Sequence, residues 1–262
     1  MRLSVIIPAA GSSLRYGEQD KLAQDLGGRP VLVRTVELFA KHPHVMEIVV
    51  AGPPERLDAF RDRFGPTLGF HGARIVEGAR AARWETVRKA LAHVGAEATH
   101  VAVHDAARPA LSVTMLDRVL DAAGRYDAVI PVVDLTSTVK RVDAAAEVVE
   151  EDASIADSIF GEVGRRSYEA RAVVETIPRD GLVVVQTPQV FSVALLRRAY
   201  DAATSGVEAT DDATLVERLG ETVMTVPGEA TNIKITTPDD LRLVRAVLGI
   251  ATESPRPAGH RF

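Results

Sequence analysis

The chain has 262 residues, of which 46% are hydrophobic and 26% are charged. This composition supplies enough apolar material for a packed core, excludes disorder for most of the chain, and fits one large α/β domain. The 31 lysines and arginines against 36 acidic residues leave a formal net charge of −5. We therefore expect no nucleic-acid partner and no membrane partner, so any anion-binding site has to be local.

Two absences narrow the chemistry further. The sequence contains no cysteine, which excludes disulfides, thiolate catalysis, iron–sulfur clusters and cysteine zinc sites. No apolar run approaches the roughly 18 residues that span a bilayer, and the strand-like Leu3–Ile7 leaves no room for a basic export signal. We expect a cytoplasmic protein, in which oxygen or histidine ligands would hold any metal.

Short β-rich runs alternate with amphipathic stretches along the chain. Strands are predicted over Leu3–Pro8, Glu47–Ala51, Arg74–Glu77, His100–His104, Ala128–Val133, Gly181–Gln186 and Thr222–Pro227. Helices are predicted over Pro30–Lys41, Pro54–Phe64, Trp84–Val94, Val113–Gly124, Ser192–Ser205, Asp211–Leu219 and Pro238–Leu248. Strands that alternate with helices favour a three-layer α/β fold around a mainly parallel sheet.

Two regions break this alternation. Residues 134–179 are polar, rich in Glu, Arg and Ala, and end in the strand-like Ala172–Ile177, which indicates an inserted arm. Residues 251–262 have neither periodicity nor apolar content and are typical of a disordered tail. We therefore expect one domain over residues 1–250, with residues 134–179 as an insertion.

The first candidate site follows the first strand, in the small-residue loop Pro8–Gly17. Small side chains let backbone N–H groups approach an anion closely, and Arg15 and Lys21 add positive charge. The loop has neither the Gly-Lys-Ser/Thr of a P-loop nor the spaced triple glycine of a dinucleotide fingerprint. An ordinary Gly/Ser turn with two solvated cations remains the alternative.

The second candidate site follows the strand His100–His104. Open α/β sheets bind ligands at the carboxyl ends of their strands, so Asp105 is placed to hold a divalent cation and Arg108 to reach a phosphate. A strand-end aspartate can equally cap a helix or form a turn. We expect His104 to be structural.

Three later segments carry weaker signals. The Thr187 hydroxyl, before Pro188, has the chemistry to bind a phosphate, although the segment also fits a Pro-containing turn. Thr210–Ala213 is typical of a helix start whose acidic residues complement the helix dipole, with a metal or substrate role as the alternative. Lys234 is predicted on a short strand, pointing opposite to its isoleucine neighbours and into a cleft.

In this order, the segments resemble the 2-C-methyl-D-erythritol 4-phosphate cytidylyltransferase family, over about residues 3–248 apart from the middle of the arm. The matching motifs are Pro8–Gly11 with Arg15 and Lys21, Gly28–Leu32, Val103–Pro109, Thr187–Phe191, Thr210–Ala213 and Asn232–Lys234. The related ribitol 5-phosphate cytidylyltransferases differ in the first and third of these motifs, where this chain follows the erythritol-phosphate pattern.

The resemblance implies a three-layer, Rossmann-like nucleotidyltransferase fold with a protruding β-arm, through which two copies form a homodimer. It implies transfer of CMP from CTP to 2-C-methyl-D-erythritol 4-phosphate, with release of pyrophosphate, in non-mevalonate isoprenoid biosynthesis. The alternative is a cytidylyltransferase that uses ribitol 5-phosphate or another sugar phosphate. A non-catalytic relative would be expected to lack one of the reacting-centre charges, and all of them are present.

The resemblance also implies roles for individual residues. Arg15, Lys21 and Lys234 would stabilise the reacting phosphates, and Asp105 would help to hold magnesium beside the nucleotide. The nucleotide would lie against Pro8, Ala9, Ala10, Gly11, Ser13, Gly78 and Thr86. Arg108 and Thr187 would bind the sugar-alcohol phosphate, with Thr138 and Arg179 contributed across the dimer.

The sequence departs from the family pattern in two places. Within the arm, Leu135–Ser137 separates Asp134 from Thr138, and Asp152–Ala172 is longer than the usual hairpin. Within Val76–Val87 the family has a Gly-Gly pair and a later serine, for which Gly78 and Thr86 stand here. Thr86 keeps a hydroxyl on a stiffer, β-branched side chain.

Overall fold

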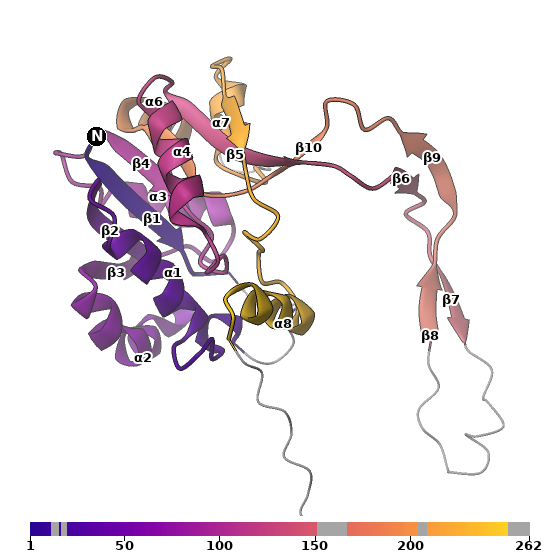
Figure 1. Cartoon of the computed structure of the whole chain (residues 1–262), viewed down its shortest axis with the longest axis horizontal. Helices are drawn as coiled ribbons and strands as arrows, with labels where there is room; N and C mark the ends of the chain where they lie inside the picture. The colour runs from indigo at the N-terminus through magenta and orange to yellow at the C-terminus, as the bar shows by residue number, and fades with distance from the viewer. Residues whose placement is uncertain (12–15, 17–19, 151–166, 204–208, 251–262) are drawn as a thin grey trace, which may run out of the picture. The chain divides into compact units, whose positions relative to one another are not determined.

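The computed structural model describes residues 1–11, 16, 20–150, 167–203 and 209–250. Its strands are β1 (Leu3–Pro8), β2 (Val45–Gly52), β3 (Ala73–Glu77), β4 (His100–Val103), β5 (Ala128–Asp134), β6 (Val139–Val142), β7 (Glu147–Glu150), β8 (Ser167–Ala170), β9 (Val173–Ile177), β10 (Val183–Val185), β11 (Gln189–Ser192) and β12 (Met224–Pro227). The helices are η2 (Lys21–Ala23), α1 (Val31–Ala40), η3 (Pro54–Arg56), α2 (Leu57–Phe70), α3 (Arg83–Leu91), α4 (Val113–Ala123), α6 (Val193–Ala202), α7 (Ala213–Arg218) and α8 (Pro238–Val247) (Figure 1).

The chain divides into two compact units, one formed by residues 1–133 and 185–262 and the other by residues 134–184. The sheet runs in the order β10-β5-β11-β4-β1-β2-β3, with β12 paired to β5. β1 is parallel to β2 and β4, β2 to β3, and β12 to β5, whereas β11 is antiparallel to both of its neighbours. The predicted α/β class with a mainly parallel sheet is therefore confirmed.

Alternation along the strands separates two apolar layers. Val5 and Ile7 of β1 face the layer that contains α1, α2, α4 and α8, while Ile6 faces the layer that contains α3, α6 and α7. Successive strand residues point to opposite faces, so helices cover both sides of the sheet. The first compact unit therefore has the three layers that the sequence predicts.

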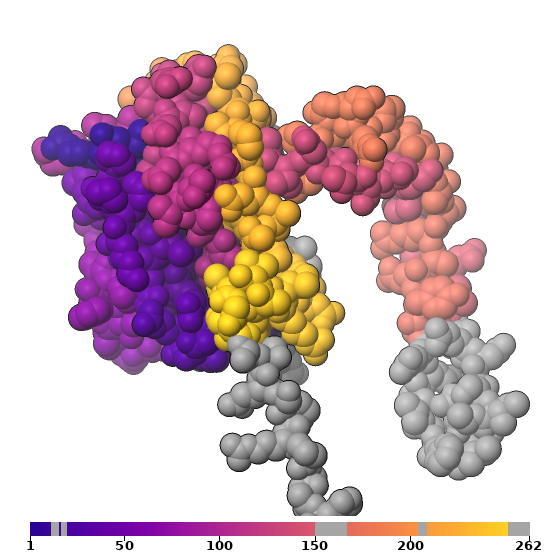
Figure 2. Space-filling view, in the orientation of Figure 1, coloured from indigo at the N-terminus to yellow at the C-terminus, as the bar shows by residue number. Residues whose placement is uncertain are grey.

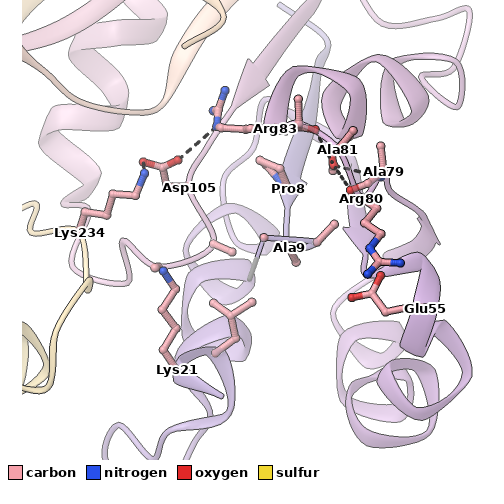
Figure 3. Close-up of a pocket in the computed structure, with 17 residues that line it drawn as sticks. Pro8, Ala9, Lys21, Glu55, Ala79, Arg80, Ala81, Arg83, Asp105 and Lys234 are labelled. Atoms are coloured by element: carbon pink, nitrogen blue, oxygen red, sulfur yellow. Dashed lines mark hydrogen bonds and ion pairs between the residues drawn. The ribbon is translucent and has the colours of Figure 1, made fainter. Parts of the chain in front are cut away.

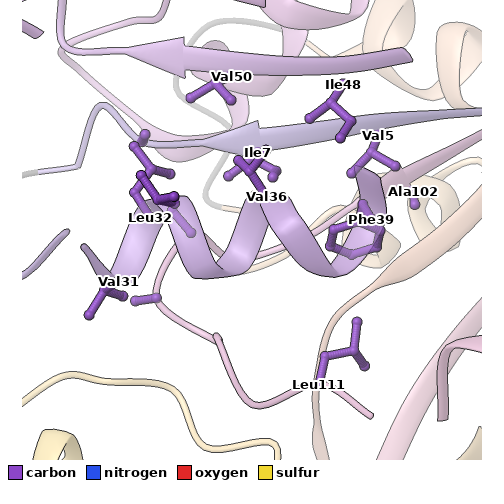
Figure 4. Packing of buried hydrophobic residues seen from close by; sticks show 14 of the residues in the cluster. Val5, Ile7, Val31, Leu32, Val36, Phe39, Ile48, Val50, Ala102 and Leu111 are labelled. Carbon is purple, nitrogen blue, oxygen red and sulfur yellow. The ribbon is translucent and has the colours of Figure 1, made fainter. Parts of the chain in front are cut away.

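Helix α1 shows why these sequences form these elements (Figure 4). Its apolar residues Leu32, Val36 and Phe39 lie on one face, are buried, and pack against strand residues of the sheet. The hydroxyl of the buried Thr35 donates to the backbone oxygen of Ala106, 2.9 Å away. The helix therefore also fixes the loop that follows β4.

Helix α8 covers another part of the same layer. Leu241 and Val244 are buried in it, and Thr237 caps the helix in a reciprocal arrangement with Asp240. The Arg245 side chain donates to the backbone oxygen of Asp25, 2.8 Å away. In Figure 2 the yellow surface of α8 accordingly lies against the indigo N-terminal part of the chain.

The structure corrects three predicted elements. Lys234 lies outside any strand, and β11 lies in a segment for which the sequence offered a Pro-containing turn as the alternative interpretation. Helix α2 continues beyond Phe64 and through Pro66 to Phe70. The buried Phe60, Phe64 and Leu68 recur every four residues, so packing favours the longer helix despite the proline.

The second unit, residues 134–184, consists of two antiparallel ribbons. β6 pairs with β9 and β7 pairs with β8. Of these four strands, the sequence indicated only β9, through the strand-like run Ala172–Ile177. Arg141 and Glu175, on opposing strands, form an ion pair of 2.5 Å, and Arg179 donates to the backbone oxygen of Thr136.

No helix in the described residues is both long and apolar enough to cross a membrane. The predicted tail, residues 251–262, lies outside the described residues.

Candidate active site

The site lies where the strand order reverses. From β1 the chain continues to β2 and β3 on one side and then places β4 on the other side of β1. Because β1 and β4 are parallel neighbours, with Ile6 opposite Val103, the loops that follow both strands meet at one edge. Open α/β sheets bind ligands in the crevice at such a switch point.

A cavity of about 590 Å³ opens at this edge (Figure 3). Its volume falls within the range of small-molecule sites. Four cationic and two anionic side chains line it among the described residues, so its wall favours anions. The lining residues are Pro8, Ala9, Ala10, Gly11, Lys21, Leu22, Glu55, Ala79, Arg80, Ala81, Ala82, Arg83, Thr86, Asp105, Ala106, Ala107 and Lys234.

One wall of the cavity is the loop after β1. The Ala9 N–H donates to the Ala51 oxygen, which fixes the loop to the end of β2. Gly78 packs beneath it: a Cβ there would come within 2.8 Å of both the Ala10 Cβ and the Gly52 oxygen. Glycine is therefore required for close approach, although it does not itself line the cavity. The predicted Ser13 and Arg15 lie outside the described residues.

Thr86 holds the segment that faces this loop. Its hydroxyl donates to the Ala79 oxygen, at 3.1 Å, and accepts from the Ala79 N–H, at 3.0 Å. The predicted nucleotide-binding threonine thus shapes the 79–82 segment of the cavity wall. Arg80 and Glu55, which the sequence analysis left without a role, point toward one another at this end of the cavity (Figure 3).

Lys21 enters the cavity from the short helix η2. The Asp20 carboxylate accepts from the Leu22 N–H at 3.0 Å, which caps this turn, and the Leu22 side chain is buried. Capping and burial therefore fix the backbone on both sides of the lysine. Figure 3 shows the Lys21 side chain pointing into the cavity, as its predicted role requires.

Asp105, two residues after the end of β4, is the anionic centre of the site. Its Oδ2 lies 3.1 Å from Lys234 Nζ and 3.0 Å from Arg108 Nε, and its Oδ1 lies 3.7 Å from Arg83 Nε. Burial alone would raise the pKa of Asp105, but Lys234, Arg83 and Arg108 hold it well below its usual range. The carboxylate is therefore ionised at neutral pH.

Lys234 reaches this centre without the predicted strand. The Ile235 N–H donates to the Ala107 oxygen, at 2.8 Å, and the Ile235 side chain is fully buried. These contacts fix the backbone beside Lys234, whose side chain points to Asp105, with Nζ 3.1 Å from Oδ2 (Figure 3). Lys234 thus lies at a cleft, as predicted, but these contacts hold it there and a strand does not.

A buried chain of hydrogen bonds fixes the backbone of Asp105. Its N–H donates to Thr187 Oγ1 at 3.0 Å, and Thr187 Oγ1 lies 3.2 Å from His104 Nδ1. His104 Nε2 lies 3.1 Å from the Arg108 oxygen and must donate to it, so Nδ1 is the acceptor. Burial lowers the pKa of His104 to about 4, which keeps the ring neutral.

Neither predicted acceptor-binding residue of the first unit lines the cavity. Thr187 is buried and its hydroxyl is engaged as described above. Arg108 donates from Nε to Asp105 and from Nη1 to the Asn232 oxygen, at 2.7 Å. In this structure both residues support Asp105. The other two, Thr138 and Arg179, are exposed residues of the second unit.

Sequence reasoning missed Arg83, which lines the cavity at the start of α3. Its Nη1 forms a 2.8 Å ion pair with Asp212, a residue 129 positions later in the chain. The sequence indicates only that Asp212 begins a helix. No local pattern indicated the pair, because its partners come from separate elements.

The structure thus combines an α/β sheet, a small-residue loop and converging cations at the strand ends, which defines the chain as a nucleotidyltransferase. The family model of 2-C-methyl-D-erythritol 4-phosphate cytidylyltransferase matches residues 3–157 and 153–250. The chain belongs to this family.

Individual relatives agree with the family match. The enzyme with this name from Frankia casuarinae is 41% identical over 249 residues, which cover 94% of this chain and 81% of the relative. The Rhodococcus jostii enzyme of the same name is 41% identical over 93% of both chains. The crystal structure of the Thermus thermophilus enzyme has a TM-score of 0.68 at 34% identity, covering 94% of this chain and 98% of the other.

Proposed function

We propose that this chain transfers a cytidylyl group from CTP to 2-C-methyl-D-erythritol 4-phosphate. A phosphate oxygen of the acceptor forms a bond to the α-phosphorus of CTP, and the bond from that phosphorus to the bridging oxygen breaks. The products are the CDP-alcohol and pyrophosphate. The observation that carries the proposal is the convergence of Lys21, Lys234 and the loop after β1 on one cavity.

This chemistry matches what the residues can supply. The attacking phosphate is already an anion, so no side chain has to remove a proton from it or form a covalent intermediate. The barrier comes from bringing anions together and from charge on the leaving pyrophosphate, which positioned cations offset. Lys21 and Lys234 take this role, together with Arg15.

The nucleotide end of the cavity is assigned to the loop after β1. Pro8, Ala9, Ala10, Gly11 and Ser13 would lie along the nucleotide, with Gly78 packed beneath this loop and Thr86 shaping the facing wall. Small side chains here leave backbone groups accessible to a base and to phosphates. Pro8–Gly11 match the family motif, whereas Gly78 and Thr86 stand where the family has a Gly-Gly pair and a serine.

Magnesium fits the donor set at Asp105. Among the described residues, no three His, Asp or Glu side chains form a metal-holding cluster, so the protein offers no complete cage. Magnesium is typically held by one or two carboxylates together with substrate phosphates. Asp105 would hold the ion on the protein side, where it would neutralise phosphate charge.

We further propose that the second unit completes the acceptor site of a partner subunit, through Thr138 and Arg179. Mixing Lys21→Ala protein with Arg179→Ala protein tests this arrangement. Random pairing should restore about a quarter of the wild-type rate, because half of the dimers would then contain one intact site. Each variant alone should be nearly inactive, and a mixture that stays inactive would show that the residues do not act across a dimer.

Phosphorus NMR tests the reaction class. With CTP, magnesium and the acceptor, we expect the signals of an asymmetric diphosphate ester and of pyrophosphate to grow at equal rates. Formation of CMP, or of CDP with free phosphate, would instead indicate hydrolysis and would contradict cytidylyl transfer.

A further inference from the structure

Arg83 connects the cavity to a buried polar cluster behind it. Its guanidinium forms an ion pair with Asp212 through Nη1, at 2.8 Å, and its Nε faces Asp105 Oδ1, at 3.7 Å. Asp105 lines the cavity, whereas Asp212 does not. Arg83 is therefore the link between a carboxylate of the site, toward which it lies in Figure 3, and a carboxylate of the core.

Asp212 is a rigid anchor for this link. It is fully buried, and the hydroxyl of the equally buried Tyr200 donates to its Oδ1. Gln189 Oε1 accepts from the backbone N–H of Asp212, at 3.2 Å, and of Ala213, at 3.1 Å. Tyr200 and Arg83 are the partners of the buried carboxylate and Gln189 fixes its backbone, so removal of the cation would leave an uncompensated charge.

The contacts of Asp105 divide between its two oxygens. Oδ2 is shared by Lys234 and Arg108, both within about 3.1 Å, whereas Oδ1 faces Arg83 at a distance too long for a direct hydrogen bond. Oδ1 is consequently the oxygen better able to accept a further ligand. Electrostatic attraction to the Arg83 guanidinium keeps Oδ1 turned toward Arg83 and away from Lys234 and Arg108.

We propose that Arg83 is a positioning residue: anchored on Asp212, it fixes the Asp105 carboxylate so that Oδ1 serves the metal–nucleotide complex. The inference rests on the proposed function. It predicts that a charge removed at Asp212, outside the cavity, changes binding inside it. Partners that orient a metal-binding carboxylate typically contribute 10–100-fold to metal affinity or activity.

The test measures binding without turnover, by titration of Mn²⁺ into protein and CTP in the absence of acceptor. Arg83→Gln and Asp212→Asn should each weaken Mn²⁺ binding by about 10–100-fold. The double variant should be no weaker than the weaker single variant, because both substitutions break one link. Arg83→Lys should recover part of the affinity, since its ammonium still pairs with Asp212 but cannot bridge both carboxylates.

Lys89→Gln is the matched control. Lys89 lies on the same helix and forms a 2.6 Å ion pair with Glu77, but it does not line the cavity. Its variant should bind Mn²⁺ and CTP like the wild type. The melting temperature of each variant, recorded without ligand, separates loss of folding from loss of binding.

The outcomes are distinct. Wild-type Mn²⁺ affinity in Arg83→Gln would overturn the proposal. So would a double variant whose loss of affinity equals the product of the two single losses, because the substitutions would then act independently. If Asp212→Asn does not fold, the comparison of Arg83→Lys with Arg83→Gln still decides the question: partial recovery of Mn²⁺ affinity supports the proposal, and no recovery overturns it. Failure of the wild type to bind CTP would instead contradict the proposed function.

Discussion

Lys21→Ala is expected to lower turnover by about 10²–10³-fold, the range for removing one preorganised group that stabilises charge in a transition state. The lysine points into the cavity from a capped turn, so its ammonium needs no reorganisation when charge develops on the phosphates. Water that fills the space would screen the phosphates less directly. Steady-state kinetics with saturating CTP and acceptor would measure the change in kcat.

The control for Lys21 is Lys41→Ala, which removes an exposed lysine that does not line the cavity. This variant should keep wild-type kcat, and both variants should keep the wild-type circular dichroism spectrum. A Lys21→Ala enzyme with unchanged kcat would remove this residue from the proposed transition-state role.

Asp105→Asn is expected to reduce turnover by a similar 10²–10³-fold and to raise the magnesium concentration needed for half-maximal rate. The amide is a poorer magnesium ligand than the carboxylate, and Lys234 and Arg108 lose the anion that lies between them. Asp239→Asn is the matched control, since Asp239 is exposed and pairs only with its helical neighbour Arg242 among the described contacts. Magnesium titration curves that overlay those of the wild type would contradict the ligand assignment.

The same substitution has a signature in stability. The pKa of Asp105 in the folded protein is below its value of about 3.9 in an unfolded chain. Its favourable contribution is therefore complete above that pH and is lost as the pH falls through the folded pKa. Urea unfolding would measure the difference in free energy of unfolding between wild type and Asp105→Asn. This difference should be constant near pH 6 and should shrink as the pH falls below about 3.9. A difference that stays constant at low pH would argue against the ionised carboxylate.

The sequence predicted the parts of the fold that are set by local periodicity. The β1 run and the α1 pattern both place apolar residues on faces that the structure buries. β11 escaped prediction because it has four residues, begins just after Pro188, and is fixed by antiparallel pairing with β4 and β5. The ribbons of residues 134–184 expose both polar and apolar residues, so they lack the one-sided pattern that marks a strand on a core.

For the site, strand-end reasoning placed Asp105 correctly, and the structure brings the predicted Lys21 and Lys234 to the same cavity. Such reasoning works because parallel strands bring their carboxyl ends to one edge. It could not reveal Arg83, whose role depends on a buried partner from a distant helix. Nor could it show that the Thr187 hydroxyl is engaged by the Asp105 backbone.

Pyrophosphate release tests the central claim most directly. Each of three reactions contains the protein, CTP and magnesium. The first also contains 2-C-methyl-D-erythritol 4-phosphate, the second contains ribitol 5-phosphate, and the third contains no acceptor. We expect rapid release with the first acceptor and only background release in the other two reactions. Preference for ribitol 5-phosphate, or release that does not depend on an acceptor, would contradict the central claim.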